Sequence, residues 1–93
     1  MAIALCFLEH GRSLSEGIAE VLTHGAATVR VVPVFLGQGG HVKEDLPRLV
    51  AAARRQFSQA EIRLEPPVGE HPAVIEAIAA FIASSTAPGS AAR

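Results

Sequence analysis

Three histidines in this chain follow apolar runs and could bind a metal ion. His10, His41 and His71 each come after a stretch rich in aliphatic or β-branched residues. Neutral imidazole is a good ligand for divalent cobalt, nickel, iron and zinc. If the apolar runs are parallel strands, their carboxyl ends meet at one edge of a sheet, where ligands of open α/β sheets bind. The pattern predicts three converging imidazoles at an open site, because no spacing resembles a closed zinc motif.

Carboxylates beside these histidines could complete the site as ligands or proton acceptors. Glu44 comes three residues after His41, and Glu70 directly precedes His71. These two carboxylates and His41 are the predicted catalytic residues, because proton transfer at neutral pH needs such groups close to the reacting atoms. Two other carboxylates also lie beside the histidines: Glu9 and Asp45.

Simpler interpretations exist for two of the four histidines. His24 lies near the C-terminus of a predicted helix, where a solvated side chain interacts favourably with the helix dipole. His71 directly precedes Pro72 and could cap the last helix instead of binding metal.

The strand that precedes His41 is the most distinctive of the predicted elements. Residues 29 to 36 are almost all apolar, as in a strand buried on both faces of a parallel sheet. Pro33 removes one backbone donor, which favours an edge position or a local irregularity. The glycines after the strand leave the backbone free to approach a ligand, so Gly39 and Gly40 are predicted to contact the substrate. A phosphate held by the same amides is an alternative, although the Lys and Ser/Thr of a P-loop are absent.

Two more strands and three helices are predicted around it. Residues 3 to 8 and 60 to 65 form short apolar strands. A helix starts at Ser13, where Ser13 and Glu16 form a capping box, and stops at Gly25. The remaining predicted features are a helix from about residue 44 to residue 57, capped by Asp45 with Pro47 in its first turn, and a last helix from Pro72 that buries Val74, Ile75, Ile78 and Ile82.

Three β-α units in a row indicate an α/β fold. Right-handed crossovers would give a short parallel sheet with helices on its faces, which is half of a doubly wound, flavodoxin-like fold. The domain is predicted to span residues 1–84. Residues 85–93 lack apolar periodicity and are predicted to form a disordered tail.

Composition narrows the classes of partner. The 93 residues carry a formal net charge of -1 with well-mixed signs, which argues against nucleic acid. Cys6 is the single cysteine, so an internal disulfide is excluded and we expect a buried thiol and a cytoplasmic protein. No apolar run is long enough to cross a membrane. A domain this small exposes much of its apolar surface, which favours a homo-oligomer.

Two segments together resemble a known family. VRVVPVFLGQGGHVKEDLPRLV, followed by IRLEPPVGEHPAVIEAI, is similar to the CbiX family of small sirohydrochlorin cobaltochelatases in cobalamin biosynthesis. The resemblance runs from about residue 23 to residue 84. It implies a three-layer chelatase-like fold and insertion of Co²⁺, or else Ni²⁺ or Fe²⁺, into sirohydrochlorin without an organic cofactor. It also implies that His41 is a metal ligand.

The amino-terminal third departs from the family pattern, in which a first strand ends in His-Gly-Ser-Arg. In one interpretation, residues 4 to 22 are the family's second strand and helix, and the first unit with its histidine is missing. In the other, LEHGRS replaces that turn and His10 is the second ligand. Arg12 in this turn is the nearest candidate to bind substrate carboxylates.

Two functions of different class follow. The chain could be a chelatase whose tetrapyrrole lies in a cleft shared between subunits, since three short strands enclose too little space for a macrocycle. Alternatively, it could be a non-catalytic, truncated chelatase-like module that binds metal, tetrapyrrole or a partner subunit. The sequence leaves open the physiological metal, the oligomeric state and whether the chain is a fragment.

Overall fold

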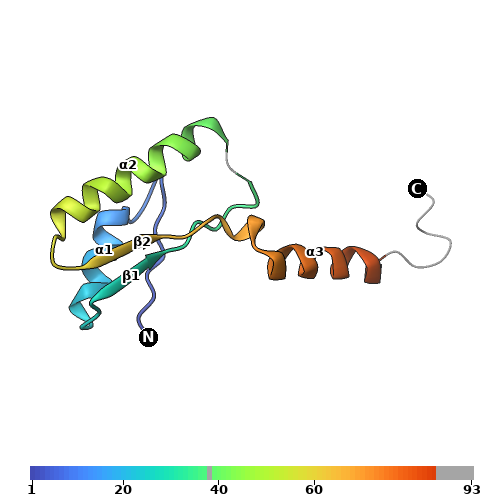
Figure 1. Cartoon of the computed structure of the whole chain (residues 1–93), viewed down its shortest axis with the longest axis horizontal. Coiled ribbons are helices and arrows are strands. Elements are labelled where there is room, and N and C mark those ends of the chain that lie inside the picture. The colour runs from blue at the N-terminus through green and yellow to red at the C-terminus, as the bar shows by residue number, and fades with distance from the viewer. Residues whose placement is uncertain (38, 86–93) are drawn as a thin grey trace.

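A computed structural model describes residues 1–37 and 39–85 of the chain. Its elements alternate between helix and strand over most of its length (Figure 1). In chain order they are α1 (Leu14–Thr23), β1 (Thr28–Val31), α2 (Gly40–Gln56), β2 (Glu61–Leu64), the short 3₁₀ helix η1 (Val68–Glu70) and α3 (Pro72–Ser85).

The two strands pair in parallel, with Val29 opposite Ile62. β1 was predicted to continue to Leu36, but regular pairing ends at Val31, two residues before Pro33, which has no N–H to donate. Hydrogen bonds still continue past the sheet. The amides of Val68 and Gly69 donate to the carbonyls of Pro33 and Phe35, each at 2.9 Å. The local irregularity predicted at Pro33 is therefore confirmed, and the chain beyond β1 stays tied to η1.

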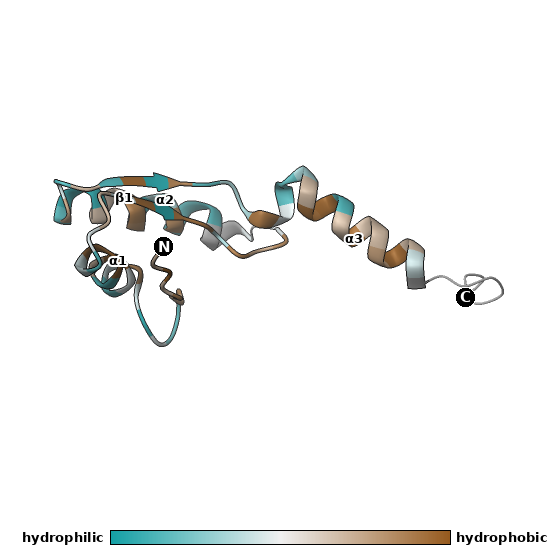
Figure 2. Cartoon of the chain, turned by 90° about the horizontal axis from the view of Figure 1, so that it is seen from below, coloured by the Kyte–Doolittle hydropathy of each residue, from teal (hydrophilic) through white to brown (hydrophobic). Residues whose placement is uncertain are grey.

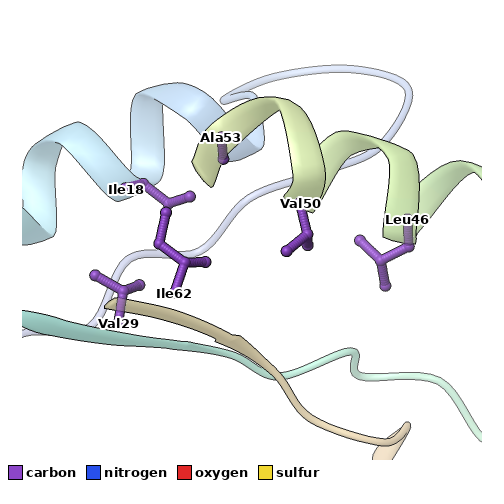
Figure 3. Close-up of a cluster of buried hydrophobic side chains, with 6 residues drawn as sticks. All are labelled: Ile18, Val29, Leu46, Val50, Ala53 and Ile62. Carbon is purple, nitrogen blue, oxygen red and sulfur yellow. The ribbon is translucent and has the colours of Figure 1, made fainter. Parts of the chain in front are cut away.

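One small core holds the strands and the first two helices together (Figure 3). Ile18 from α1 and Val50 from α2 are almost fully buried. They belong to one cluster with Val29 of β1 and Ile62 of β2. Leu46 and Ala53 complete the buried set. Because α1 and α2 share this core, both helices cover the same face of the sheet.

Local signals position α1 as the sequence predicts. Ser13 is the N-cap: its hydroxyl accepts from the Glu16 amide at 3.1 Å, and the Glu16 carboxylate accepts from the Ser13 amide at 2.8 Å. The hydrogen bond from the Ser13 amide to the Glu16 carboxylate, followed by a contribution of the Ser13 side chain, lowers the pKa of Glu16. Gly25 follows the helix with φ +88°, a conformation that glycine adopts without strain.

The predicted start of α2 is wrong by about four residues. The helix begins at Gly40 rather than near residue 44, and the Lys43 amide already donates to the Gly39 carbonyl. Pro47 consequently lies inside the helix, where it has no N–H to donate to the preceding turn. Gly39 is the N-cap, not Asp45, which instead pairs with Arg48. This shift places both His41 and Glu44 on α2.

The strand predicted over residues 3 to 8 does not form, so the described residues contain two strands rather than three. Residues 1–8 instead run along α1, with Ala4 and Cys6 close to Gly17. The Phe7 amide donates to the Arg12 carbonyl, which closes the following turn. Apolar alternation alone does not make a strand, because the backbone also needs a neighbour to pair with.

The last helix is present as predicted, but its predicted burial is wrong. Ile75, Ile78 and Ile82 are all exposed, because α3 projects away from the rest of the molecule (Figure 1). Among the described elements α3 contacts only η1. On the uncovered face of the sheet, Arg30 and Arg63 are exposed, so the described residues do not form the three layers that we predicted.

Of the helices described, none has the length and apolarity needed to cross a bilayer. The predicted disordered tail, apart from Ser85 at the end of α3, lies outside the described residues.

Candidate active site

His41 belongs to the first turn of α2, one residue after Gly40. The chain reaches it from β1 through the segment that is tied to η1 by hydrogen bonds. The start of α2 therefore lies beyond the carboxyl end of β1 (Figure 1), as the sequence predicts for a ligand-binding edge.

Glu44 is exposed on α2, one turn after His41. Residues three apart on a helix lie on the same side of it, so positions 41 and 44 are neighbours along α2. Gly39 has open space where a side chain would begin, and it accepts the first helical hydrogen bond from Lys43. A bulky ligand could therefore approach the backbone of Gly39 closely, because no side chain stands in its way at this position.

His71 caps α3, which was the simpler of its two interpretations. Its Nδ1 accepts a hydrogen bond from the Ala73 amide at 3.1 Å, and its carbonyl accepts from Val74 and Ile75. Because Nδ1 accepts in this cap, a neutral imidazole carries its proton on Nε2, and His71 could bind a metal ion only after the cap breaks or the tautomer changes. Glu70 is exposed beside it, at the end of η1.

The cap and a ligand role of His71 can be separated by two substitutions. His71→Ala should lower the helicity of α3 and the stability of the chain by about 1 kcal/mol, because the Ala73 amide loses its acceptor. His71→Asn should restore the cap through its side-chain oxygen while removing the imidazole. Circular dichroism with thermal unfolding measures the first effect, and cobalt titration of the His71→Asn protein measures the second. Equal stability of all three proteins would contradict the capping role.

His10 and Arg12 lie in the turn that joins the N-terminal segment to α1, and both are exposed. In two views, this turn lies away from the starts of α2 and α3 (Figure 1, Figure 2). Arg12 forms an ion pair with Glu20 of α1 at 2.6 Å. Within one chain, neither residue is therefore placed beside His41.

The described side chains include no group of three or more His, Cys, Asp or Glu that could hold a metal ion. A hollow of about 290 Å³, lined in part by Leu22, Phe57 and Ala60, lies at the amino ends of the strands, away from the predicted edge.

Cys6 and His24 have structural surroundings. Cys6 is half-buried against α1, and burial raises the pKa of its thiol, which keeps it protonated and unsuited to metal binding. His24 is the C-cap of α1, with Nδ1 3.0 Å from the Glu20 carbonyl oxygen. Both agree with the simpler interpretations of the sequence.

Gly69 positions the site but was not singled out from the sequence. A Cβ atom at Gly69 would overlap the Leu36 carbonyl oxygen and lie 2.5 Å from the Leu36 Cα. The segment leading to His41 therefore packs directly on the backbone of η1. The one available signal was a glycine between Val68 and Glu70, a residue that permits close backbone approach.

Comparison with known proteins agrees with this arrangement of helices and strands. The family model for CbiX matches residues 1–85. The chain belongs to the CbiX family. A CbiX protein from Marinobacter aquaeolei VT8 has a similar crystal structure, with a TM-score of 0.73 and 26% identity over 85% of this chain and 66% of that one.

Two curated relatives of this CbiX chain come from Priestia megaterium. A sirohydrochlorin cobaltochelatase is 31% identical over 75 residues, which is 80% of this chain and 24% of the relative. A sirohydrochlorin ferrochelatase is 25% identical over 73 residues, which is 77% of this chain and 27% of the relative. The chain thus spans about a quarter of the length of these relatives.

Proposed function

We propose that this chain takes part in inserting a divalent metal ion, Co²⁺ in the first instance, into sirohydrochlorin or a related tetrapyrrole. The observation that carries the proposal is the CbiX family match over residues 1–85, which includes the glycine turn and His41. The relatives act on cobalt and on iron, so Fe²⁺ is the second candidate metal and Ni²⁺ the third.

The chemistry assigns a role to each candidate residue. Two pyrrole protons leave the macrocycle as one divalent ion enters, so the site needs a ligand that releases the ion and a group that accepts protons. His41 at the start of α2 is proposed as the ligand, and the neighbouring Glu44 as the proton acceptor. His10, Glu70 and His71 lie in other turns of the chain, and they would belong to the site only if those turns came close to the start of α2. Arg12 would bind substrate carboxylates only if its ion pair with Glu20 broke.

A second candidate function is a module that binds a metal ion or tetrapyrrole without turnover. The turn that contains His10 lies apart from the start of α2, which favours it. Absorbance spectroscopy of sirohydrochlorin mixed with the full chain and Co²⁺ separates the two. A chelatase should accelerate the spectral change of metal insertion over the protein-free rate, whereas a module would shift the tetrapyrrole spectrum without accelerating insertion. An unchanged spectrum and rate would reject both.

A further inference from the structure

The first turn of α2, which contains His41, lacks the local interactions that hold the start of α1. The Ser13 hydroxyl caps α1, and the Glu16 carboxylate accepts from the Ser13 amide in return. α2 begins instead after Gly39, which has no side chain to serve as a cap, and its first turn contains no acidic residue. Lys43 also adds a positive charge close to the positive end of the helix dipole. The helix that carries the candidate ligand therefore begins with weak local support.

Pro47 weakens the same end of α2 from inside the helix. Residue 47 would normally donate to the carbonyl of Lys43, four residues earlier, but proline has no N–H. The helical hydrogen bonds that hold the first turn are those donated by residues 43 to 46. One of them, from the Lys43 amide to the Gly39 carbonyl, measures 3.1 Å. Gly40, the first helical residue, loses more backbone entropy on ordering than any other residue type.

The contacts that fix α2 in the molecule come after this turn. Among the side chains that the structure describes, those of α2 in the core are Leu46, Val50 and Ala53 (Figure 3). Lys43 and Glu44 are exposed. Local opening costs least where few buried contacts hold a segment. The start of α2 is therefore the part of this helix that opens at the lowest cost.

We propose that the first turn of α2 exchanges between a helical and an open form, and that a divalent metal ion bound at His41 shifts it to the helical form. The inference rests on the proposed function, in which His41 and Glu44 act at one reaction centre. Three residues span about 4.5 Å along a helix axis but roughly 10 Å in an extended segment. Only the helical form brings the negative charge of Glu44 close to the ion, so the ion binds that form more tightly and selects it.

Such an equilibrium suits a site that must pass its metal ion on. The apparent affinity for the ion is lower than that of a permanently formed helix, because only the helical fraction of the chain binds well. When the turn reopens, Glu44 moves away from the ion and His41 alone holds it. The same motion that weakens binding would thus favour transfer of the ion to the tetrapyrrole.

Hydrogen exchange followed by mass spectrometry tests the turn directly. In the metal-free chain, a fragment of residues 40–47 should exchange at least about tenfold faster than a fragment of residues 48–56. Co²⁺ at ten times its Kd should slow exchange of residues 40–47 about tenfold, and it should have no such effect on the His41→Ala protein. Equal protection of the two fragments in the metal-free chain would overturn the proposal.

Calorimetric titration of the same samples with Co²⁺ separates this inference from the proposed function. If Co²⁺ bound without slowing exchange of residues 40–47, the ordering of the turn would be refuted and the metal site would stand. If Co²⁺ did not bind at all, the metal site and the ordering would both be refuted.

Gly39→Ser strengthens the helix start in the absence of metal. The backbone at Gly39 has φ -74° and ψ 169°, close to φ -78° and ψ 164° at the Ser13 cap, and no atom lies within 4 Å of its Cβ position. The new hydroxyl would accept from the Val42 amide and should slow exchange of residues 40–47 about fivefold.

Gly37→Ser is the matched control, because it adds the same side chain in equally open surroundings before the helix begins. It should leave exchange of residues 40–47 unchanged. Gly39→Ser should also bind Co²⁺ at least as tightly as the wild-type chain. Equal exchange rates in the two serine variants, or weaker Co²⁺ binding by a more ordered turn, would overturn the proposal.

Discussion

His41→Ala should lower cobalt affinity and metal insertion by about a hundredfold or more while leaving the fold intact. Removing a group that merely supports a metal ligand typically costs 10–100-fold, and the loss of a ligand itself should cost at least as much. The fold should survive, because His41 is in the first turn of α2, whereas the core residues of this helix come later, at Leu46, Val50 and Ala53. Calorimetric titration with Co²⁺ and absorbance-monitored insertion measure the loss, and circular dichroism confirms folding.

His24→Ala is the matched control, because it removes an imidazole from the far end of α1. It should leave cobalt affinity unchanged. His10→Ala tests the amino-terminal turn: an effect as large as that of His41→Ala would mean that this turn supplies the second ligand in the assembled protein. A folded His41→Ala protein with wild-type cobalt affinity would refute the metal site and leave the non-catalytic module as the better account.

Gly69→Ala should destabilise the chain by about 2 to 3 kcal/mol, which is the upper range for forcing an extra methyl group into a packed site. The new Cβ would overlap the Leu36 carbonyl, and a backbone group cannot move aside as the end of a flexible side chain can. The melting temperature should fall by roughly 10 °C or more in a domain of this size.

Gly37→Ala is the control for the glycine substitution, because no atom lies within 4 Å of the Cβ position at Gly37. Thermal and urea unfolding followed by circular dichroism would measure both variants. If the two melted at the same temperature, the close contact between η1 and Leu36 would not contribute to stability.

Features encoded within a few residues could be predicted from the sequence. The capping box at Ser13 and Glu16, the stop at Gly25 and the start at Pro72 each depend on local hydrogen bonds or allowed backbone angles. The start of α2 could not, because Pro47 was expected in the first turn of the helix, whereas it lies inside a helix whose residues Leu46 and Val50 are held in the core.

Features that depend on contacts between residues far apart in the chain could not be predicted from the sequence. Residues 3 to 8 alternate like a strand, yet pairing requires an edge that the described chain does not give them. The apolar residues of α3 predicted burial, which is wrong for a single chain, because Ile75, Ile78 and Ile82 are exposed. For the site, the order of the elements predicted that His41 and His71 follow the ends of strands. The distance between side chains of separate turns could not be predicted, because it is set by packing.

The hydrogen bonds that continue past β1 and β2 link the segment that leads to the glycine turn with the base of α3. Because the Pro33 and Phe35 carbonyls accept from Val68 and Gly69, the approach to the glycine turn and the base of α3 move together or not at all. A ligand that shifted the segment before the glycine turn would therefore also shift η1 at the base of α3, and a contact at α3 would act on that segment in return. Thermodynamic linkage makes the two effects equal in free energy. Binding at the glycine turn and contact at α3 could therefore influence each other through these hydrogen bonds.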